Sequence, residues 1–166
     1  MGDVRLRFVE EKDASFVQKY ASEKKVSDTC LLPYPYPENG GEEWVNFAIN
    51  NRKRGTSLSY AILYKEEFSG VVSFINIEKE EGTSNLGYWI GSPFWNKRIG
   101  TTAIKEILKI GFNELGLKEI KGECLEKNVP SIKILKNNGF SKKDDFIYEE
   151  GKFAGEKGIL YSRIKG

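Results

Sequence analysis

The stretch that decides the fold is Asn85-Leu-Gly-Tyr-Trp-Ile-Gly91, followed by Ser92-Pro-Phe-Trp-Asn-Lys-Arg-Ile-Gly-Thr101. The first seven residues are mostly apolar and aromatic, which predicts a strand, and Gly87 within it indicates a β-bulge or a close backbone approach. Residues 92–98 read as a turn. Residues 99–115 predict a helix that ends at Gly116. The apolar face of this helix comprises Ala103, Ile104, Ile107, Leu108 and Leu115.

The turn before this helix has the chemistry of a phosphate site. The first backbone N–H groups of a helix have no partner within it, and together with the helix dipole they attract anions. Lys97 and Arg98 add positive charge at this point. The alternative is that both are solvated turn residues and that Gly100 only relieves crowding. Short glycine motifs are weak signals, so the turn alone favours the alternative.

Outward from this stretch, the chain predicts alternating strands and helices. The pattern indicates a strand at 4–9 and a helix capped by Asp13, then an ordered loop at 27–41 that contains three prolines. A helix at 42–54 ends at Gly55, and a hairpin follows at 57–64 and 68–77. After the central helix we expect a strand at 118–125, a short helix from Asn128 to Gly139, and two last strands at 146–150 and 152–164.

Composition restricts the classes of function. A chain of 166 residues, 39% hydrophobic and 30% charged, predicts one soluble domain spanning 1–166. No apolar run is long enough to span a membrane, and we expect a cytoplasmic protein. The net charge of +2 comes from interspersed residues without a basic stripe, so nucleic acid is not expected as a partner.

The few cysteines and the absence of histidine narrow the chemistry further. Cys30 and Cys124 have no paired spacing, so neither a disulfide framework nor a zinc site is indicated. Because the chain has no histidine, Ser-His-Asp and Cys-His catalysis and histidine-based metal sites are excluded. We therefore expect no metal, and the chemistry falls to carboxylates, hydroxyls, amides or backbone groups.

The ordered combination of motifs resembles one family. The series is Gly87-Tyr-Trp-Ile90, then Phe94-Trp95, the turn, the helix through Phe112, Asn128-x-x-Ser131 and finally Asn138-Gly-Phe140. It resembles the GNAT superfamily of N-acetyltransferases, and within it the Rim-type ribosomal-protein N-terminal acetyltransferases. The segments Leu32-Pro-Tyr-Pro-Tyr36 and Gly70-Val-Val-Ser-Phe74 are also similar to that branch, so the resemblance covers most of the chain. The phosphate turn departs from the family pattern, because Trp95 replaces an arginine or glutamine and Arg98 replaces a glycine.

The resemblance implies an α/β (α+β) fold: a mixed, mostly antiparallel, splayed sheet of six to seven strands with about four helices. It implies acetyl-CoA as the cofactor, with the pantetheine arm between the strands at 85–91 and 118–125 and the diphosphate on the N–H groups of Arg98 to Thr102. The cofactor residues implied in this way are Trp89, Ile90, Trp95, Lys97, Arg98, Ile99, Gly100, Thr101, Thr102, Asn128 and Ser131.

The implied reaction is direct attack of a neutral amine on the thioester carbonyl. By resemblance, the backbone N–H near Ile90 stabilises the oxyanion and Ser131 serves the leaving thiolate. Without the resemblance, Ser131 and Asn128 would read as helix-start residues that bond the local backbone. The base is Glu149, Glu150 or a water molecule.

The acceptor is expected to enter over Tyr34, Tyr36 and Trp44, although these aromatics are equally suited to anchoring the proline loop. A terminal α-amine has a pKa of about 7.7–8.0 and needs only a weak base, whereas a lysine amine near 10.4 is mostly charged. We therefore expect a protein or peptide N-terminus. A small amine, such as a polyamine or an aminoglycoside, and a non-catalytic acyl-CoA-binding module stay open, as does a homodimer.

Overall fold

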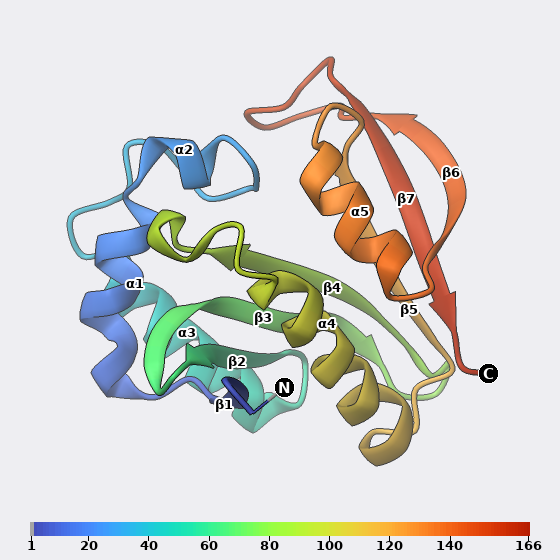
Figure 1. Cartoon of the computed structure of the whole chain (residues 1–166), viewed down its shortest axis with the longest axis horizontal. Helices are drawn as coiled ribbons and strands as arrows, with labels where there is room; N and C mark the ends of the chain where they lie inside the picture. The colour runs from blue at the N-terminus through green and yellow to red at the C-terminus, as the bar shows by residue number, and fades with distance from the viewer. Residues whose placement is uncertain (1) are drawn as a thin grey trace.

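Seven strands form one mixed sheet in the computed structural model of this chain, which describes residues 2–166 (Figure 1). The strand order is β1-β2-β3-β4-β5-β7-β6. The strands are β1 (Val4–Phe8), β2 (Leu58–Tyr64), β3 (Glu67–Glu78), β4 (Thr83–Ile90), β5 (Glu119–Leu125), β6 (Ser141–Ile147) and β7 (Lys157–Ile164). The α-helices are α1 (Ala14–Ala21), α2 (Lys24–Ser27), α3 (Gly40–Arg54), α4 (Ile99–Lys109) and α5 (Val129–Asn137).

Every neighbouring pair of strands is antiparallel except β4 and β5, which are parallel. This confirms the predicted mixed, mostly antiparallel sheet. The β4–β5 ladder contains only four residue pairs, from Thr83↔Glu119 to Leu86↔Gly122. Beyond that last pair the two strands diverge, as Figure 1 shows. The sheet is therefore splayed between the two strands that the resemblance implied.

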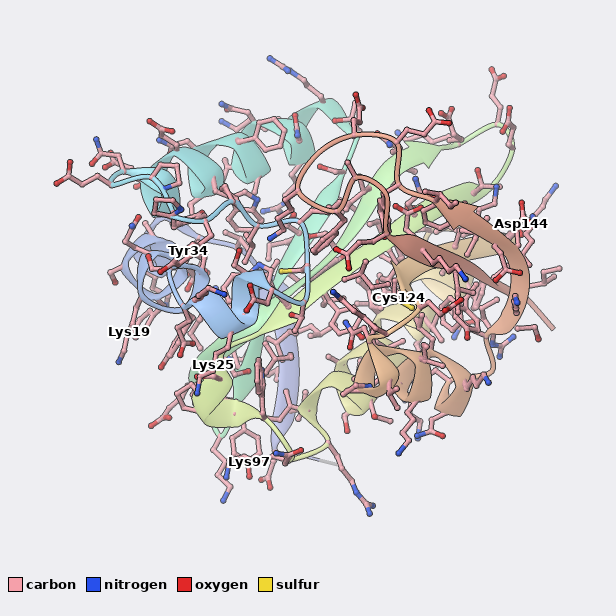
Figure 2. The ribbon with its side chains drawn as sticks, turned by 90° about the horizontal axis from the view of Figure 1, so that it is seen from above. Lys19, Lys25, Tyr34, Lys97, Cys124 and Asp144 are labelled. Atoms are coloured by element: carbon pink, nitrogen blue, oxygen red, sulfur yellow. The ribbon has the colours of Figure 1, made fainter. Side chains whose placement is uncertain are left out.

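Helices cover both faces of the sheet. α3 lies on one face, and α4 and α5 lie on the other, in both views (Figures 1 and 2). The buried core runs through the sheet and includes Phe74, Ile104 and Ile120, which are almost fully buried. The four predicted helices are present, and the four-residue helix α2 is an addition. Within residues 2–166, none of the helices is both long and apolar enough to pass through a membrane.

Gly87 does not form the bulge that was one of its two predicted roles. The β3–β4 register is continuous from Gly70↔Ile90 to Ile75↔Asn85, and the irregularity lies further along, between Ile75 and Glu78. Asn76 occupies a left-handed conformation there, with φ of 53°. A Cβ at Gly87 would lie 2.8 Å from the Ile75 Cδ1 atom. The close approach at Gly87 is therefore made by a side chain rather than by a bulged backbone.

Two other boundaries differ from prediction. Leu115 is 40% exposed rather than on the apolar face, because a π-helical segment at Ile110–Glu114 follows α4. The Leu115 N–H bonds the Ile110 carbonyl at 3.0 Å, which is a five-residue step that breaks the 3.6-residue period. At the other end of the chain, β6 begins at Ser141 rather than at 146, and the loop before β7 includes residues 149–156.

The start of the outer strand β6 was not predicted because its first residues are polar. Lys142, Lys143, Asp144 and Asp145 are all exposed, so the alternation that marks a half-buried strand is missing. The strand pairs only with β7, and its register shifts between Lys142 and Asp144. β6 is therefore a charged, bulged edge of the sheet.

Replacing Gly111 by alanine should destabilise the protein, although alanine normally favours a helix. A Cβ at Gly111 would lie 2.8 Å from Ile120 Cδ1 and 3.1 Å from the Phe74 ring. We expect this overpacking to lower the free energy of unfolding by about 1–3 kcal/mol in urea denaturation. Exposed Asn113, replaced by alanine, is the control in the same segment and should change stability little. A more stable Gly111→Ala protein would contradict the packing argument.

Candidate functional site

The divergence of β4 and β5 leaves backbone groups of β4 pointing into the space between them. The Gly91 N–H donates to the Ser69 carbonyl at 2.8 Å, so Ser69 and Gly91 form a hydrogen-bonded pair between β3 and β4. Because bonded and non-bonded pairs alternate along antiparallel strands, the N–H and C=O groups of Ile90 point away from β3. The Ile90 carbonyl accepts a hydrogen bond from the Trp95 indole Nε1 at 2.8 Å. The Ile90 N–H points into the opened side of the sheet.

Two hydroxyl groups meet across this opening. The Tyr88 hydroxyl on β4 and the Ser131 Oγ on α5 lie 2.6 Å apart. Ser131 is held in place by the start of its helix, because its N–H donates to the Asn128 Oδ1 at 3.3 Å. Asn128 is thus a helix cap, as its alternative role predicted. The cap and the hydroxyl pair together fix Ser131 opposite β4.

Burial sets the protonation of the groups around Ser131. Removal from water raises the pKa of Tyr88 to about 12, and the hydrogen bond between Tyr88 and Ser131 opposes this rise. Burial likewise raises the pKa of the Cys124 thiol to about 11, again opposed by Ser131. Both groups therefore keep their protons at neutral pH, and the Tyr88 hydroxyl can donate to Ser131.

The turn before α4 combines a left-handed residue with a helix start. Arg98 has φ of 62° and ψ of 19°, the conformation that glycine adopts most easily. Its carbonyl accepts from the Thr102 N–H at 3.2 Å, and the preceding N–H groups of the first turn have no acceptor within the helix. Gly100 also has a packing role, because a Cβ there would lie 2.9 Å from Ile134 Cδ1 on α5.

Positive charge surrounds this turn. Lys97 and Arg98 are exposed, and neither forms an ion pair with any residue between 2 and 166. The Lys25 ammonium lies 6.0 Å from the centre of the Trp95 ring, and Figure 2 shows Lys25 and Lys97 on the same side of the molecule. The turn therefore offers unpaired N–H groups and cationic side chains together, which suits a phosphate.

A cavity of about 660 Å³ lies between the proline loop, residues 28–39 between α2 and α3, and the β6–β7 loop, residues 148–156. The β6–β7 loop is on the opposite side of the molecule from Lys97 in Figure 2. The cavity is lined by Ser27, Asp28, Pro33, Tyr34, Lys127, Lys152, Phe153 and Glu156. Among residues 2–166, no group of three or more cysteine and carboxylate side chains is arranged to hold a metal ion.

Of the three aromatic residues predicted to contact the acceptor, Tyr34 lines this cavity, whereas Tyr36 and Trp44 do not. Tyr34 is 54% exposed and lines it. The Tyr36 ring instead fills the space beside Gly40, where a Cβ would lie 2.5 Å from it, and Trp44 packs against the core. Glu149 and Glu150 are exposed in the β6–β7 loop.

The structure thus brings Ile90 and Ser131 to the opened side of the sheet and places Lys97 to Thr102 at the start of α4. Sequence reasoning missed Tyr88 and Lys152. The position of Tyr88 within the Gly87-Tyr-Trp-Ile90 motif, two residues before Ile90, was a usable signal, because residues two apart share a face of a strand. Nothing local in the sequence marked Lys152.

Known proteins share this architecture. A family model described as the acetyltransferase (GNAT) domain matches residues 3–141. The uncharacterized N-acetyltransferase p20 of Bacillus licheniformis is 27% identical over 139 residues, covering 82% of this chain and 78% of that protein.

Two solved structures are similar in fold. RimL, a ribosomal L7/L12 α-N-protein acetyltransferase in complex with coenzyme A, superposes with a TM-score of 0.90 at 20% identity, covering 99% of this chain and 95% of RimL. The microcin C7 self-immunity acetyltransferase MccE, in complex with acetyl-CoA and AMP, has a TM-score of 0.88 at 22% identity, with 99% and 94% of the two chains covered.

The hydroxyl pair should couple Tyr88 and Ser131 energetically. In a double-mutant cycle of Tyr88→Phe and Ser131→Ala, we expect a coupling of about 0.5–1.5 kcal/mol, because each single change removes the same 2.6 Å hydrogen bond. Free energies of unfolding from urea denaturation measure it. The cycle of Tyr60→Phe with Ser131→Ala is the control and should be additive, because Tyr60 lies on β2 and shares no hydrogen-bond partner with Ser131 among the described residues. Additive Tyr88 and Ser131 changes would contradict the bond.

Proposed function

The chain belongs to the acetyltransferase (GNAT) domain family, and on that premise we propose that it acetylates the α-amine of a protein or peptide N-terminus. Family membership and the N-acetyltransferase relatives make it an acetyl-CoA-dependent N-acetyltransferase. Acetyl-CoA supplies the acetyl group in activated form, as a thioester. The proposal concerns the acceptor and the residues of this chain that perform the transfer.

The start of α4 is the proposed site for the coenzyme phosphates. The N–H groups from Arg98 to Thr102 and the charges of Lys97 and Arg98 suit two adjacent phosphate groups. The left-handed conformation of Arg98 supports this role, because the turn keeps a shape that glycine would favour while it also carries a cation. Trp89, Ile90, Trp95 and Asn128 stay as predicted neighbours of the rest of the coenzyme.

The Ile90 N–H is the proposed donor to the thioester oxygen. Its direction into the opened side of the sheet supports this role, since a donor fixed in advance stabilises the negative charge that develops during attack. The Trp95 indole bonds the Ile90 carbonyl and so helps to fix the orientation of this peptide group.

Ser131 is the proposed proton donor to the leaving thiolate, and Tyr88 is the proposed group that returns a proton to Ser131. The observation that carries the proposed function is this 2.6 Å hydroxyl pair beside the opened strand. Because burial raises the pKa of Tyr88 to about 12, the phenol remains protonated and can replace the proton that Ser131 gives up. On the acceptor side, Glu149, Glu150 or a water molecule is the proposed base. The exposure of both carboxylates favours a relay through water.

The charges of the cavity beside Tyr34 support a peptide acceptor over a polyamine. Its two carboxylates are already paired, Asp28 with Lys24 at 3.1 Å and Glu156 with Lys127 at 2.5 Å. The glutamates at 38, 42 and 43 are absent from its lining within the described residues. A polycation would find little unbalanced negative charge there, whereas the neutral backbone of a peptide needs none. Tyr34 is the proposed acceptor contact, and Tyr36 and Trp44 stay predictions.

Replacing Ser131 by alanine should slow acetyl transfer about 100-fold, because proton transfer by a positioned side chain contributes roughly 10²–10⁴. Calorimetry with acetyl-CoA should give the same Kd for the variant and the unmodified protein. Release of free thiol in the presence of short peptides with serine, alanine or methionine at the N-terminus measures the transfer.

The Asn113→Ala variant, far from the hydroxyl pair in sequence and exposed, is the control for this measurement. If calorimetry detected no binding of acetyl-CoA to the unmodified protein, the proposed function would be wrong. Normal transfer by Ser131→Ala would remove Ser131 from the mechanism and leave the acceptor class standing.

The pH dependence of transfer should identify the acceptor amine. With a peptide α-amine, kcat/KM should rise to about pH 8 and then level off, because the amine is then neutral. With spermidine or a lysine side chain the rise would continue toward about pH 10. Tyr88, with a pKa of about 12, should add no step between pH 6 and pH 10. A higher kcat/KM for spermidine than for every peptide would reject the N-terminal acceptor.

A further inference from the structure

Lys152 joins two segments that are far apart in the sequence. It lies in the β6–β7 loop, and its ammonium donates to the carbonyls of Ser27 and Leu32 and, at 2.9 Å, to the Ser27 Oγ. These partners bracket the turn from Ser27 to Leu32, which leads from α2 into the proline loop. The same turn is closed internally, because the Ser27 Oγ donates to the Leu32 carbonyl at 2.8 Å.

A second side chain reaches the same turn from α5. The Asn128 Nδ2 donates to the Thr29 carbonyl at 3.3 Å, while its Oδ1 holds the Ser131 N–H. Asn128 follows β5 and Lys152 precedes β7 in the chain, so both are attached to the part of the sheet that contains β5 and β7. They therefore connect that part to the 27–32 turn, across the side where β4 and β5 diverge.

The other end of this connection is anchored to β4. Glu23, just before α2, accepts from the Ser92 N–H at 3.0 Å and from the Ser92 hydroxyl. Ser92 lies two residues after the end of β4, and Ser27 is 1% exposed. The 27–32 turn is thus fixed to the β4 part through α2 and to the β5 part through Lys152 and Asn128. The sheet opens between these two parts, and the turn bridges them.

The contacts of the Lys152 ammonium are unusual because, in the described part of the chain, the charge is not balanced by a carboxylate. No carboxylate within residues 2–166 pairs with it, and its partners are neutral oxygens. Desolvation lowers its pKa, opposed by Cys30 and Asp28. Lys152, Ser27 and Tyr34 all line the 660 Å³ cavity, so the bridge forms part of its wall.

We infer that Lys152 is a positioning residue for the acceptor: its contacts with Ser27 and Leu32 hold the proline loop against the β6–β7 loop and so set the width of the acceptor cavity. This inference rests on the proposed function, since it takes the cavity as the place where the acceptor amine enters. Lys152 acts on the acceptor through the loop and has no part in binding the coenzyme, because the proposed phosphate site around Lys97 and the β6–β7 loop lie on opposite sides of the molecule (Figure 2).

The first test measures whether Lys152 stabilises the 27–32 turn, and it does not depend on acetyl transfer. Hydrogen exchange of the segment 27–34, followed by mass spectrometry, should be about tenfold faster in Lys152→Met, because the loop loses its hydrogen bonds to the ammonium. Lys152→Arg should restore part of the protection. Lys157→Met is the matched control, since Lys157 is also exposed and makes no ion pair among residues 2–166.

The second test measures acceptor binding with a hexapeptide that begins with serine. Lys152→Met should raise the KM for this peptide by about five- to tenfold and leave kcat and the Kd for acetyl-CoA near their unmodified values. A merely structural loss would change both substrates alike. Unchanged exchange and unchanged KM in Lys152→Met would overturn the role of Lys152 alone. Failure of the unmodified protein to bind acetyl-CoA would overturn the proposed function and the acceptor role with it.

Discussion

The short ladder between β4 and β5 is the constraint on which the rest of the molecule depends. Four pairs hold these parallel strands together, and after Leu86↔Gly122 the backbone of β4 has no strand on that side. Polar backbone groups need partners, and in an ordinary sheet a neighbouring strand provides them. Here the chain leaves the N–H of Ile90 pointing into the opened side of the sheet. A continuous ladder would have been more regular and would have paired this N–H with a neighbouring strand.

Several contacts maintain the opening without closing it. The helix cap of Asn128 fixes Ser131 on one side, and the Trp95 indole fixes the Ile90 carbonyl on the other. The Tyr88–Ser131 hydrogen bond links β4 directly to α5. A pair of neutral hydroxyls suits that position, since either can donate and neither adds charge to a partly buried space.

The sequence predicted most of the fold because its local signals agree with each other. The strand, turn and helix around Arg98 appear where the apolar pattern placed them, and Gly55 and Gly139 have the positive φ values expected where helices end. The resemblance named Ser131 and Ile90 from motif order alone. The structure places these two residues in the first turn of α5 and at the end of β4, and their roles stay predictions.

The residues and elements that were not predicted fall into two groups. Some become recognisable only through a contact with a residue far away in the sequence, and others lack the hydrophobic periodicity of a helix or strand. Tyr88 becomes a candidate only through a partner 43 residues away, and Lys152 through partners 120 and 125 residues away. The four residues of α2 are too few for a helical period to be visible. In β6, polar residues on both faces removed the alternation that marks a strand.

The charged edge strand has a consequence for how copies of this chain meet. An open edge of a sheet is a template onto which a second chain can pair, and such pairing can continue without limit. β6 presents Lys142 to Asp145 at that edge, with its ladder interrupted by a bulge. A neighbouring molecule would have to strip water from these charges and match a kinked backbone. The charges and the bulge of β6 therefore disfavour the addition of a further strand, and with it growth into fibrils, on this side of the sheet.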